Sequence, residues 1–312
     1  MATGLAHQRP TAAAPAAAGR SRLREDLIGW SFAAPFVILF GVFLAGPILV
    51  SFLLSFTSFG LRDLRNPIGT SFVGLDNYLQ LIGDETFRAA LFNTAYFVLV
   101  GVPLTLILGL VIANALNRGV TRLRTFFRVG YYIPVITSIV AIAVIWRFLL
   151  NPDVGLINLS LERFGIQGPN WLGDPVLAMP SIIAMAVWRN LGFAMIVFLA
   201  GLQAIPASLY EAASIDGATR WQAFRHVTVP MLRPTILFLT VITTIGYLQL
   251  FEEPFVMTGG GPLDKTLSIS MYMYEEGFTF FHQGYAAAIA YVLFVLVAFV
   301  ALLQFRLIRT ET

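Results

Sequence analysis

The chain has no cysteine, a single lysine and few histidines, and each scarcity excludes a class of chemistry. Without cysteine there are no disulfides, no thiolate catalysis and no cysteine-ligated metal sites. Lys265 is the only lysine, and Asp264 precedes it where a phosphate-binding loop needs glycine. The sequence therefore predicts no ATP-binding P-loop. Because His7, His226 and His282 lie far apart along the chain, we expect no metal site either.

Charge is also scarce, since charged residues make up 12% of the chain and hydrophobic residues 57%. The mean hydropathy is +0.78. A helix of roughly 20 apolar residues crosses the hydrocarbon core of a bilayer. Six stretches reach that length, at 30–56, 91–113, 129–150, 176–202, 236–257 and 285–305. The predicted fold class is all-α, a polytopic membrane protein with six transmembrane helices.

The few basic residues are unevenly distributed along the chain. Six spans would put both termini on one side, and 13 of the 20 basic residues would share that side: Arg9, Arg20, Arg22, Arg24, Arg118, Arg122, Arg124, Arg128, Arg220, Arg225, Arg233, Arg306 and Arg309. The positive-inside rule then predicts cytoplasmic N- and C-termini in a cell membrane. Residues 1–26, rich in Ala, Pro and Arg, are predicted to be a disordered basic tail, and residues 27–312 one transmembrane domain.

One cytoplasmic loop, at 206–230, interrupts the apolar chain with the charged stretch YEAASIDGATRWQAFRHVTVP. Pro206 or Ser208 can start a short helix, and Gly217 can end it in a left-handed conformation. Thr219 and Gln222 form a capping-box pattern that starts a second helix, which Pro230 should stop. The loop is predicted to be a helix–turn–helix at the membrane surface. From composition alone it could equally be an interfacial helix that only covers lipid headgroups.

The order of residues in this loop resembles a known signature. Glu211-Ala212-Ala213, Gly217 and the sequence from Val227 to Pro230 match the E-A-A…G…I-x-L-P pattern of permease subunits in ABC importers, with valine replacing isoleucine and leucine. NTAYF, YYIPVITSIVAIAVIWRFLLNP and MTGGGP are similar to the same family, and the resemblance covers nearly all of the chain after residue 26. It points to the carbohydrate-uptake branch, of the maltose and glycerol-3-phosphate permease type.

The resemblance implies a type I importer permease fold and a subunit that is not an enzyme. Its partners would be a second homologous permease, two ATPase subunits, an extracytoplasmic solute-binding protein, a carbohydrate substrate and the lipid bilayer, with no nucleic acid. No cofactor would be bound by this chain, because ATP and Mg²⁺ would sit on the ATPase subunits. The loop at 206–230 would be the coupling helix that docks on an ATPase, through Glu211, Ala212, Ala213, Asp216 and Gly217.

A substrate path is predicted from ionisable residues inside the spans, which are costly in lipid and usually face a cavity or a partner. Arg189, Glu252 and Glu253 are such residues, and Pro254 should loosen the helix beside the glutamates. Aromatic and polar side chains near them could serve the apolar faces and hydroxyls of a sugar. The predicted path residues are Trp188, Arg189, Asn190, Phe193, Tyr247, Gln249, Phe251, Glu252 and Glu253.

Two other functions compete with this interpretation. A proton-coupled secondary transporter could use Glu252 or Glu253, but it gives no reason for the cytoplasmic signature. An intramembrane enzyme could use the same glutamates as a carboxylate pair. Adjacent residues on a helix point about 100° apart, however, so they would share one substrate poorly.

Overall fold

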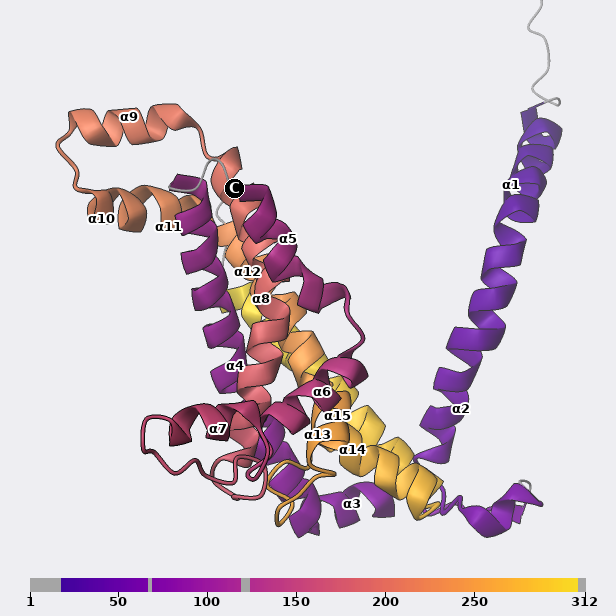
Figure 1. The fold of residues 1–312 in the computed structure, drawn as a ribbon. Coiled ribbons are helices and arrows are strands. Elements are labelled where there is room, and N and C mark those ends of the chain that lie inside the picture. Colours follow the sequence, from indigo (N-terminus) through magenta and orange to yellow (C-terminus); the bar gives the residue numbers. More distant parts are fainter. Residues whose placement is uncertain (1–17, 67–68, 119–123, 308–312) are drawn as a thin grey trace, which may run out of the picture. The chain divides into compact units, whose positions relative to one another are not determined.

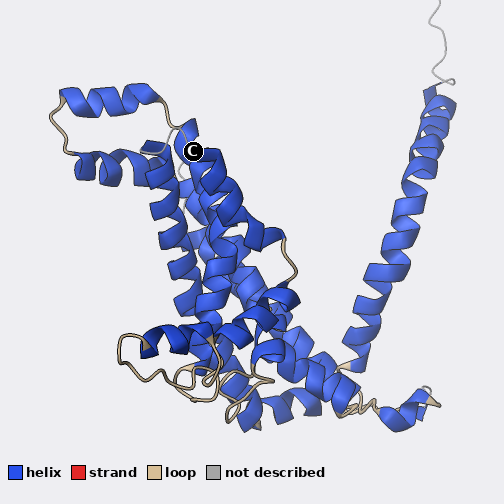
Figure 2. Ribbon diagram, in the orientation of Figure 1, coloured by secondary structure: helices blue, strands red, loops and turns tan. Residues whose placement is uncertain are grey.

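The computed structural model describes residues 18–66, 69–118 and 124–307. Within these ranges the structure is helices and loops, and β-structure is limited to one isolated bridge between Thr57 and Phe72 (Figure 2). The chain divides into two compact units, Met1–Leu53 and Leu54–Thr312. The all-α prediction is confirmed.

The described part of the first unit is one long helical run, made of α1 (Ala18–Phe40), the π-helical segment η1 (Gly41–Ala45) and α2 (Gly46–Leu54), whose last residue belongs to the second unit. Its apolar part, Ile28–Leu54, is long enough to cross a membrane. The helix begins inside the segment 1–26 that was predicted to be disordered; residues 1–17 lie outside the described residues. No proline lies between Pro15 and Pro35, so nothing in this stretch forbids helix before residue 27.

The second unit is a helical bundle with short helices at both ends. Its elements, in order, are η2 (Leu61–Leu64), α3 (Asp76–Gly83), α4 (Glu85–Arg118), α5 (Arg124–Ile136), α6 (Ile139–Leu149), α7 (Leu156–Glu162), α8 (Ala178–Ala204), α9 (Ala207–Ile215), α10 (Arg220–Ala223), η4 (Phe224–Thr228), α11 (Val229–Met231), α12 (Arg233–Leu248), α13 (Glu252–Met257), α14 (Ile269–Tyr274), η5 (Glu275–Thr279) and α15 (Gln283–Leu307). α3 and α7 lie at one end of this unit, and the α9–α10 pair lies at the other (Figure 1).

Helix α8 is the centre of the bundle and packs against α4, α5, α12 and α13. Of its apolar window, 61% is buried, compared with 28% for α4 and for α15. A helix that is apolar all round is expected in such a central position. Gly192 permits the closest approach, because a Cβ there would lie 2.0 Å from the carbonyl oxygen of Tyr131 on α5.

Four of the six predicted spans correspond to long helices, and the stretches 129–150 and 236–257 fall on two bent helix pairs. In the second pair, Arg220–Met231 with Arg233–Leu248, only the second helix overlaps the predicted span. The stretch 129–150, expected to be one helix, is α5 followed by α6 at an angle of 99°. Pro134 has no backbone N–H to donate to the helix. The Thr137 hydroxyl donates a hydrogen bond to the Ile133 carbonyl at 2.8 Å. Ser138 is then extended, with φ −54° and ψ 128°, so the straight span was wrong at this point.

The fifth span also differs from the sequence prediction. Pro230 does not stop the preceding helix, which runs through α11 to Met231 and bends by 64° into α12. At the other end α12 stops at Leu248, and α13 starts afresh at Glu252. The break therefore precedes the two glutamates. Pro254 falls in the first turn of α13, where a missing N–H costs nothing.

The connections at the α3 and α7 end also contain short helices. The short helix α3 is entered through Gly74, which has φ +60°. Helices α7 and α14 lie between predicted spans, at 150–176 and 257–285. Ser268 caps α14, since its hydroxyl accepts the N–H of Met271 at 3.1 Å.

Candidate functional site

The signature segment folds as a hairpin of two short helices, α9 and α10, with the second continued by η4 and α11. Gly217 has φ +76°, as the predicted left-handed turn requires. The N–H of Gly217 donates to the Ser214 carbonyl at 3.1 Å, and that of Ala218 to the Ala213 carbonyl at 2.9 Å. These two bonds form a Schellman motif, which satisfies carbonyls at the end of α9.

The second helix of the hairpin starts with the predicted capping box. The N–H of Thr219 donates to Gln222 Oε1 at 2.7 Å, and the N–H of Gln222 donates to Thr219 Oγ1 at 3.3 Å. Two backbone donors that a helix start would leave free are therefore satisfied. The prediction of a helix–turn–helix is confirmed at the level of local structure.

A solvent-open hollow of about 490 Å³ lies between the two helices of the hairpin. Four of the five predicted coupling residues line it: Ala212, Ala213, Asp216 and Gly217. Glu211 is exposed on the same helix. The small side chains leave the backbone of α9 accessible there, and a partner of complementary shape could approach it closely.

The base of the hairpin is attached to the bundle. The hydroxyls of Tyr210 and Thr228 lie 2.9 Å apart, which joins α9 to η4. Tyr210 and Val227 pack against a buried cluster from α4, α8 and α12 that includes Leu202 and Leu232. Side-chain packing therefore connects the α9–α10 hairpin directly to α8 and α12.

A second polar group lies inside the bundle around Tyr247. Its hydroxyl is 2.9 Å from Thr105 Oγ1 on α4 and accepts a 3.4 Å hydrogen bond from the side-chain amide of Asn190 on α8. Glu253 is only 7% exposed, and Arg189 lies near enough to act on its charge. Arg189 Nε is buried and has no hydrogen-bond partner among the residues that the structure describes. Four of the predicted path residues are thus brought together: Arg189, Asn190, Tyr247 and Glu253.

The other predicted path residues are placed differently. Trp188 lines an apolar groove of about 370 Å³ between α4 and α8 and lies 5.7 Å, centroid to centroid, from the ring of Trp146. Phe193 packs against the buried cluster near the hairpin. Gln249 and Glu252 are exposed at the break between α12 and α13. The ring of Phe251 stacks on the ring of Phe255 rather than on the Tyr247 group.

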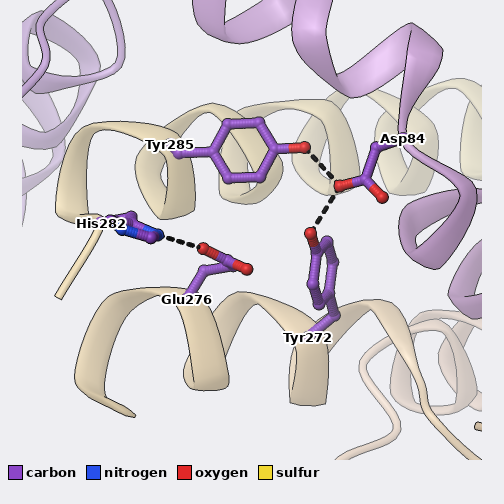
Figure 3. Close-up of polar contacts among 5 residues, drawn as sticks. All are labelled: Asp84, Tyr272, Glu276, His282 and Tyr285. Atoms are coloured by element: carbon purple, nitrogen blue, oxygen red, sulfur yellow. Dashed lines mark hydrogen bonds and ion pairs between the residues drawn. The ribbon is translucent and has the colours of Figure 1, made fainter. Parts of the chain in front are cut away.

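Sequence reasoning did not identify Thr105, the α4 partner of Tyr247. A lone threonine in an apolar helix carries no local signal. It also did not identify the polar network at the far end of the bundle, where Asp84 Oδ2 accepts hydrogen bonds from Tyr272 at 2.5 Å and Tyr285 at 2.6 Å (Figure 3). Beside it, His282 Nδ1 lies 2.8 Å from Glu276 Oε2.

Asp84 also caps α4, because its Oδ1 accepts the N–H groups of Thr86 and Phe87. Burial by itself raises the pKa of the Asp84 carboxyl. The hydrogen bonds from Tyr272, Tyr285 and the two backbone N–H groups outweigh that effect and hold the pKa below its ordinary value. The network joins the start of α4 to α14 and α15.

Known proteins resemble this chain over most of its length. Residues 101–310 match the family model described as binding-protein-dependent transport system inner membrane component. The chain is 39% identical over 302 residues to the lactose transport system permease protein LacF of Rhizobium radiobacter, covering 94% of this chain and 99% of that one. It is 36% identical over 281 residues to the trehalose/maltose transport system permease protein MalF of Thermococcus litoralis, covering 88% and 92%.

Solved structures give the same fold. A chain of a bacterial ABC transporter involved in the import of the acidic polysaccharide alginate superimposes with a TM-score of 0.77 at 28% identity, over 93% of this chain and 97% of that one. A chain of the alginate transporter in complex with a periplasmic protein bound to an alginate pentasaccharide gives a TM-score of 0.78 at 27% identity, over 94% and 99%.

Proposed function

Because this chain belongs to the binding-protein-dependent transport system inner membrane components, we propose that it forms half of the path of an ATP-driven importer that carries a sugar. It is a multi-pass membrane permease subunit. The proposal of a sugar is supported by relatives named for lactose, arabinooligosaccharides and trehalose/maltose. A solute-binding protein would deliver the sugar, and a second homologous permease would complete the path.

The observation that carries the proposal is the α9–α10 hairpin. It places a small-residue hollow, lined by Ala212, Ala213 and Gly217, on a base packed against α8 and α12. A helix pair seated in a partner's groove is a recurrent recognition mode. We infer that each hairpin of the permease pair docks on one of two ATPase subunits, and that Glu211 and Asp216 contribute charge to this contact. ATP and Mg²⁺ would be bound by those subunits.

The Tyr247 group is proposed to border the sugar path. Broken helices commonly line substrate sites in transporters, and the break between α12 and α13 lies directly before Glu252. Arg189 Nε, Asn190, Tyr247 and Glu253 supply donors and acceptors of the kind that sugar hydroxyls need. The proton-coupled transporter based on Glu252 and Glu253 is not favoured, since it leaves the hairpin without a role.

The orientation is part of the same proposal. The α9–α10 hairpin lies at one end of the second unit (Figure 1), and we propose that this end is cytoplasmic. Reporter fusions after Asn117 and after Gly168 should report opposite sides, with the first inside. Finding both on one side would contradict this topology.

The functional test is reconstitution of the full complex in liposomes, with a second permease, ATPases and a binding protein. Labelled lactose, trehalose and arabinotriose should be offered in turn, with ATP inside or withheld. We expect uptake of at least one sugar that needs both ATP and the binding protein. Uptake by this chain alone, driven by a proton gradient, would instead support the secondary transporter.

A further inference from the structure

The two sides of the α9–α10 hairpin carry opposite charges. Glu211 and Asp216 lie on α9 or directly after it, and α9 has no basic residue. From α10 to the start of α12 the chain has three arginines and no acidic residue. Among the residues that the structure describes, none of Arg220, Arg225 and Arg233 takes part in an ion pair. The basic side of the hairpin therefore has no anionic partner within the described chain.

The second helix of the hairpin has two distinct faces. Four of its side chains line the hollow between α9 and α10: Gln222, Ala223, His226 and Val227. Trp221, Phe224 and Arg225 are spaced by three and four residues, so a helix places them together on the face opposite the hollow. None of these three side chains lines the hollow. We refer to Trp221, Phe224 and Arg225 as the Trp221 face.

The Trp221 face is an open amphipathic surface. Trp221 is 68% exposed, Arg225 is exposed and Phe224 is half-buried. The rings of Trp221 and Phe224 are stacked, with centroids 5.6 Å apart and an angle of 24° between their planes. Stacking at this separation holds the two rings as one unit. The face therefore combines a preformed apolar surface with one positive charge.

The position of the hairpin turns this face toward the spans. In Figure 1, α9 lies farther from the α3 and α7 end than α10 does. Because the hollow lies between the two helices, the opposite face of α10 is turned away from α9. The helical run Arg220–Met231 also makes an angle of 64° with α12, so it lies closer to the plane of a membrane than to the direction of that span.

The chemistry of the Trp221 face fits the surface of a bilayer. Tryptophan is enriched at the level of the lipid headgroups, and arginine extends its guanidinium group toward their phosphates. Basic residues next to a membrane attract anionic lipids, whereas the carboxylates of Glu211 and Asp216 on the other side of the hairpin would be repelled. Both helices are therefore satisfied when α10 faces the bilayer and α9 faces away from it.

We propose that the Trp221 face rests on the headgroups of anionic phospholipids. The hairpin then contacts the bilayer through α10, while α9 and the hollow remain open to an ATPase subunit. Contact with the headgroups fixes the tilt of α10 relative to the membrane. This inference goes beyond the import function and holds whichever solute is carried.

The test uses the permease pair and the full complex in nanodiscs, with partner subunits that also lack cysteine. Bimane attached to Trp221→Cys lies on the proposed lipid face, and bimane attached to His226→Cys lies in the hollow as the matched control. A phosphatidylcholine with a nitroxide near its glycerol should quench the first probe strongly and the second weakly, because a nitroxide quenches only at short range. Arg225→Cys gives a second probe position on the same face if Trp221→Cys fails to assemble.

The preference for anionic lipid is tested with a second labelled lipid. Phosphatidylglycerol with the same nitroxide should quench the Trp221→Cys probe more than labelled phosphatidylcholine does at an equal mole fraction. Adding Arg225→Gln should reduce this preference about fivefold, the factor that corresponds to ~1 kcal/mol per arginine. Arg163→Gln, which changes an exposed arginine directly after α7 at the opposite end of the unit, should leave the preference unchanged.

Three results would overturn the proposal. The first is weak quenching, or equal quenching of the two probe positions, in the full complex. The second is quenching in the permease pair that disappears when the ATPases bind, which would assign the Trp221 face to that protein contact. The third is equal quenching by the two labelled lipids, which would show that anionic headgroups are not selected. Sugar uptake does not enter these measurements, so any of these results leaves the import function untouched.

Discussion

Two short helices at opposite ends of the bundle, α7 and α9, end in the same turn. In α9 the N–H groups of Gly217 and Ala218 donate to Ser214 and Ala213, and in α7 those of Gly165 and Ile166 donate to Glu162 and Leu161. The glycines have nearly equal φ angles, +76° and +75°. The two turns nevertheless lead into different structures. The α9 turn continues into a second helix and a lined hollow, whereas the α7 turn continues into a loop fixed by Asn158.

The comparison separates local conformation from function. A left-handed glycine stabilises a helix end wherever it occurs. Of these two turns, only that at Gly217 also presents small residues and carboxylates on a base packed against two long helices of the bundle. Whether such a turn takes part in coupling should therefore depend on where it lies in the fold. The same substitution at Gly217 and at Gly165 tests this.

The largest expected effect is that of Gly217→Val. A β-branched residue resists the left-handed conformation by about 1–2 kcal/mol and should tilt α10 away from its docking geometry. Steric overlap with neighbouring atoms does not contribute, because no atom of the described residues lies within 4 Å of a Cβ at Gly217 or at Gly165. Uptake by the reconstituted complex should be nearly lost in Gly217→Val and retained in Gly165→Val, which carries the same strain. Equal loss in both variants would mean that strain alone, not coupling, is responsible.

The next effect concerns the loop after α7. Asn158 is 3% exposed, donates to the carbonyls of Pro152 and Pro169, and accepts the indole N–H of Trp171. Asn158→Ala leaves these groups unpaired, at a cost of about 1–3 kcal/mol for each that stays buried.

We expect faster proteolysis of the 151–175 loop in Asn158→Ala, measured by timed digestion of the purified complex. ATP hydrolysis in the absence of the binding protein should be unchanged, because the hairpin is intact. A loss of this basal hydrolysis would tie the far loop to coupling and weaken the contrast between the two ends.

A smaller effect is expected at the second helix of the hairpin. Thr219→Ala removes one half of the capping box, which typically costs about 1 kcal/mol. Thr219→Ser keeps the hydroxyl and serves as the control. Hydrogen exchange at Arg220, Trp221 and Gln222 should quicken in the alanine variant alone. Unchanged exchange would mean that the docked partner, rather than the cap, holds this turn.

The turn and the capping box could be predicted from sequence because their hydrogen bonds join residues close together along the chain. The Tyr247 group could not, since Thr105 and Tyr247 are 142 residues apart and only the packing of α4 against α12 brings them together. The bend after Ile136 and the break after Leu248 were missed for a related reason. An apolar run fixes the length of a span, but its straightness depends on single residues such as Thr137 and on the helices around it.

The smallest expected effect is the pH response of the Asp84 network. The pKa of the Asp84 carboxyl is held below its ordinary value, so its hydrogen bonds stabilise the folded state at neutral pH. That contribution is lost as the pH falls below about 4, toward the lowered pKa. Asp84→Asn should lower the thermal unfolding midpoint at pH 7 in detergent, and the difference from wild type should shrink toward about pH 3. A difference that is constant with pH would assign the effect to packing.

The central claim, that the α9–α10 hairpin is the contact for the ATPase subunits, is tested most directly by thiol labelling on this cysteine-free chain. Ala212→Cys lies in the hollow, and Phe164→Cys, at an 83% exposed position beside the α7 turn, is the control. Maleimide should label Ala212→Cys rapidly in the permease pair alone and much more slowly once the ATPases are bound, whereas Phe164→Cys should react equally in both. Equal labelling of Ala212→Cys with and without the ATPases would contradict the claim.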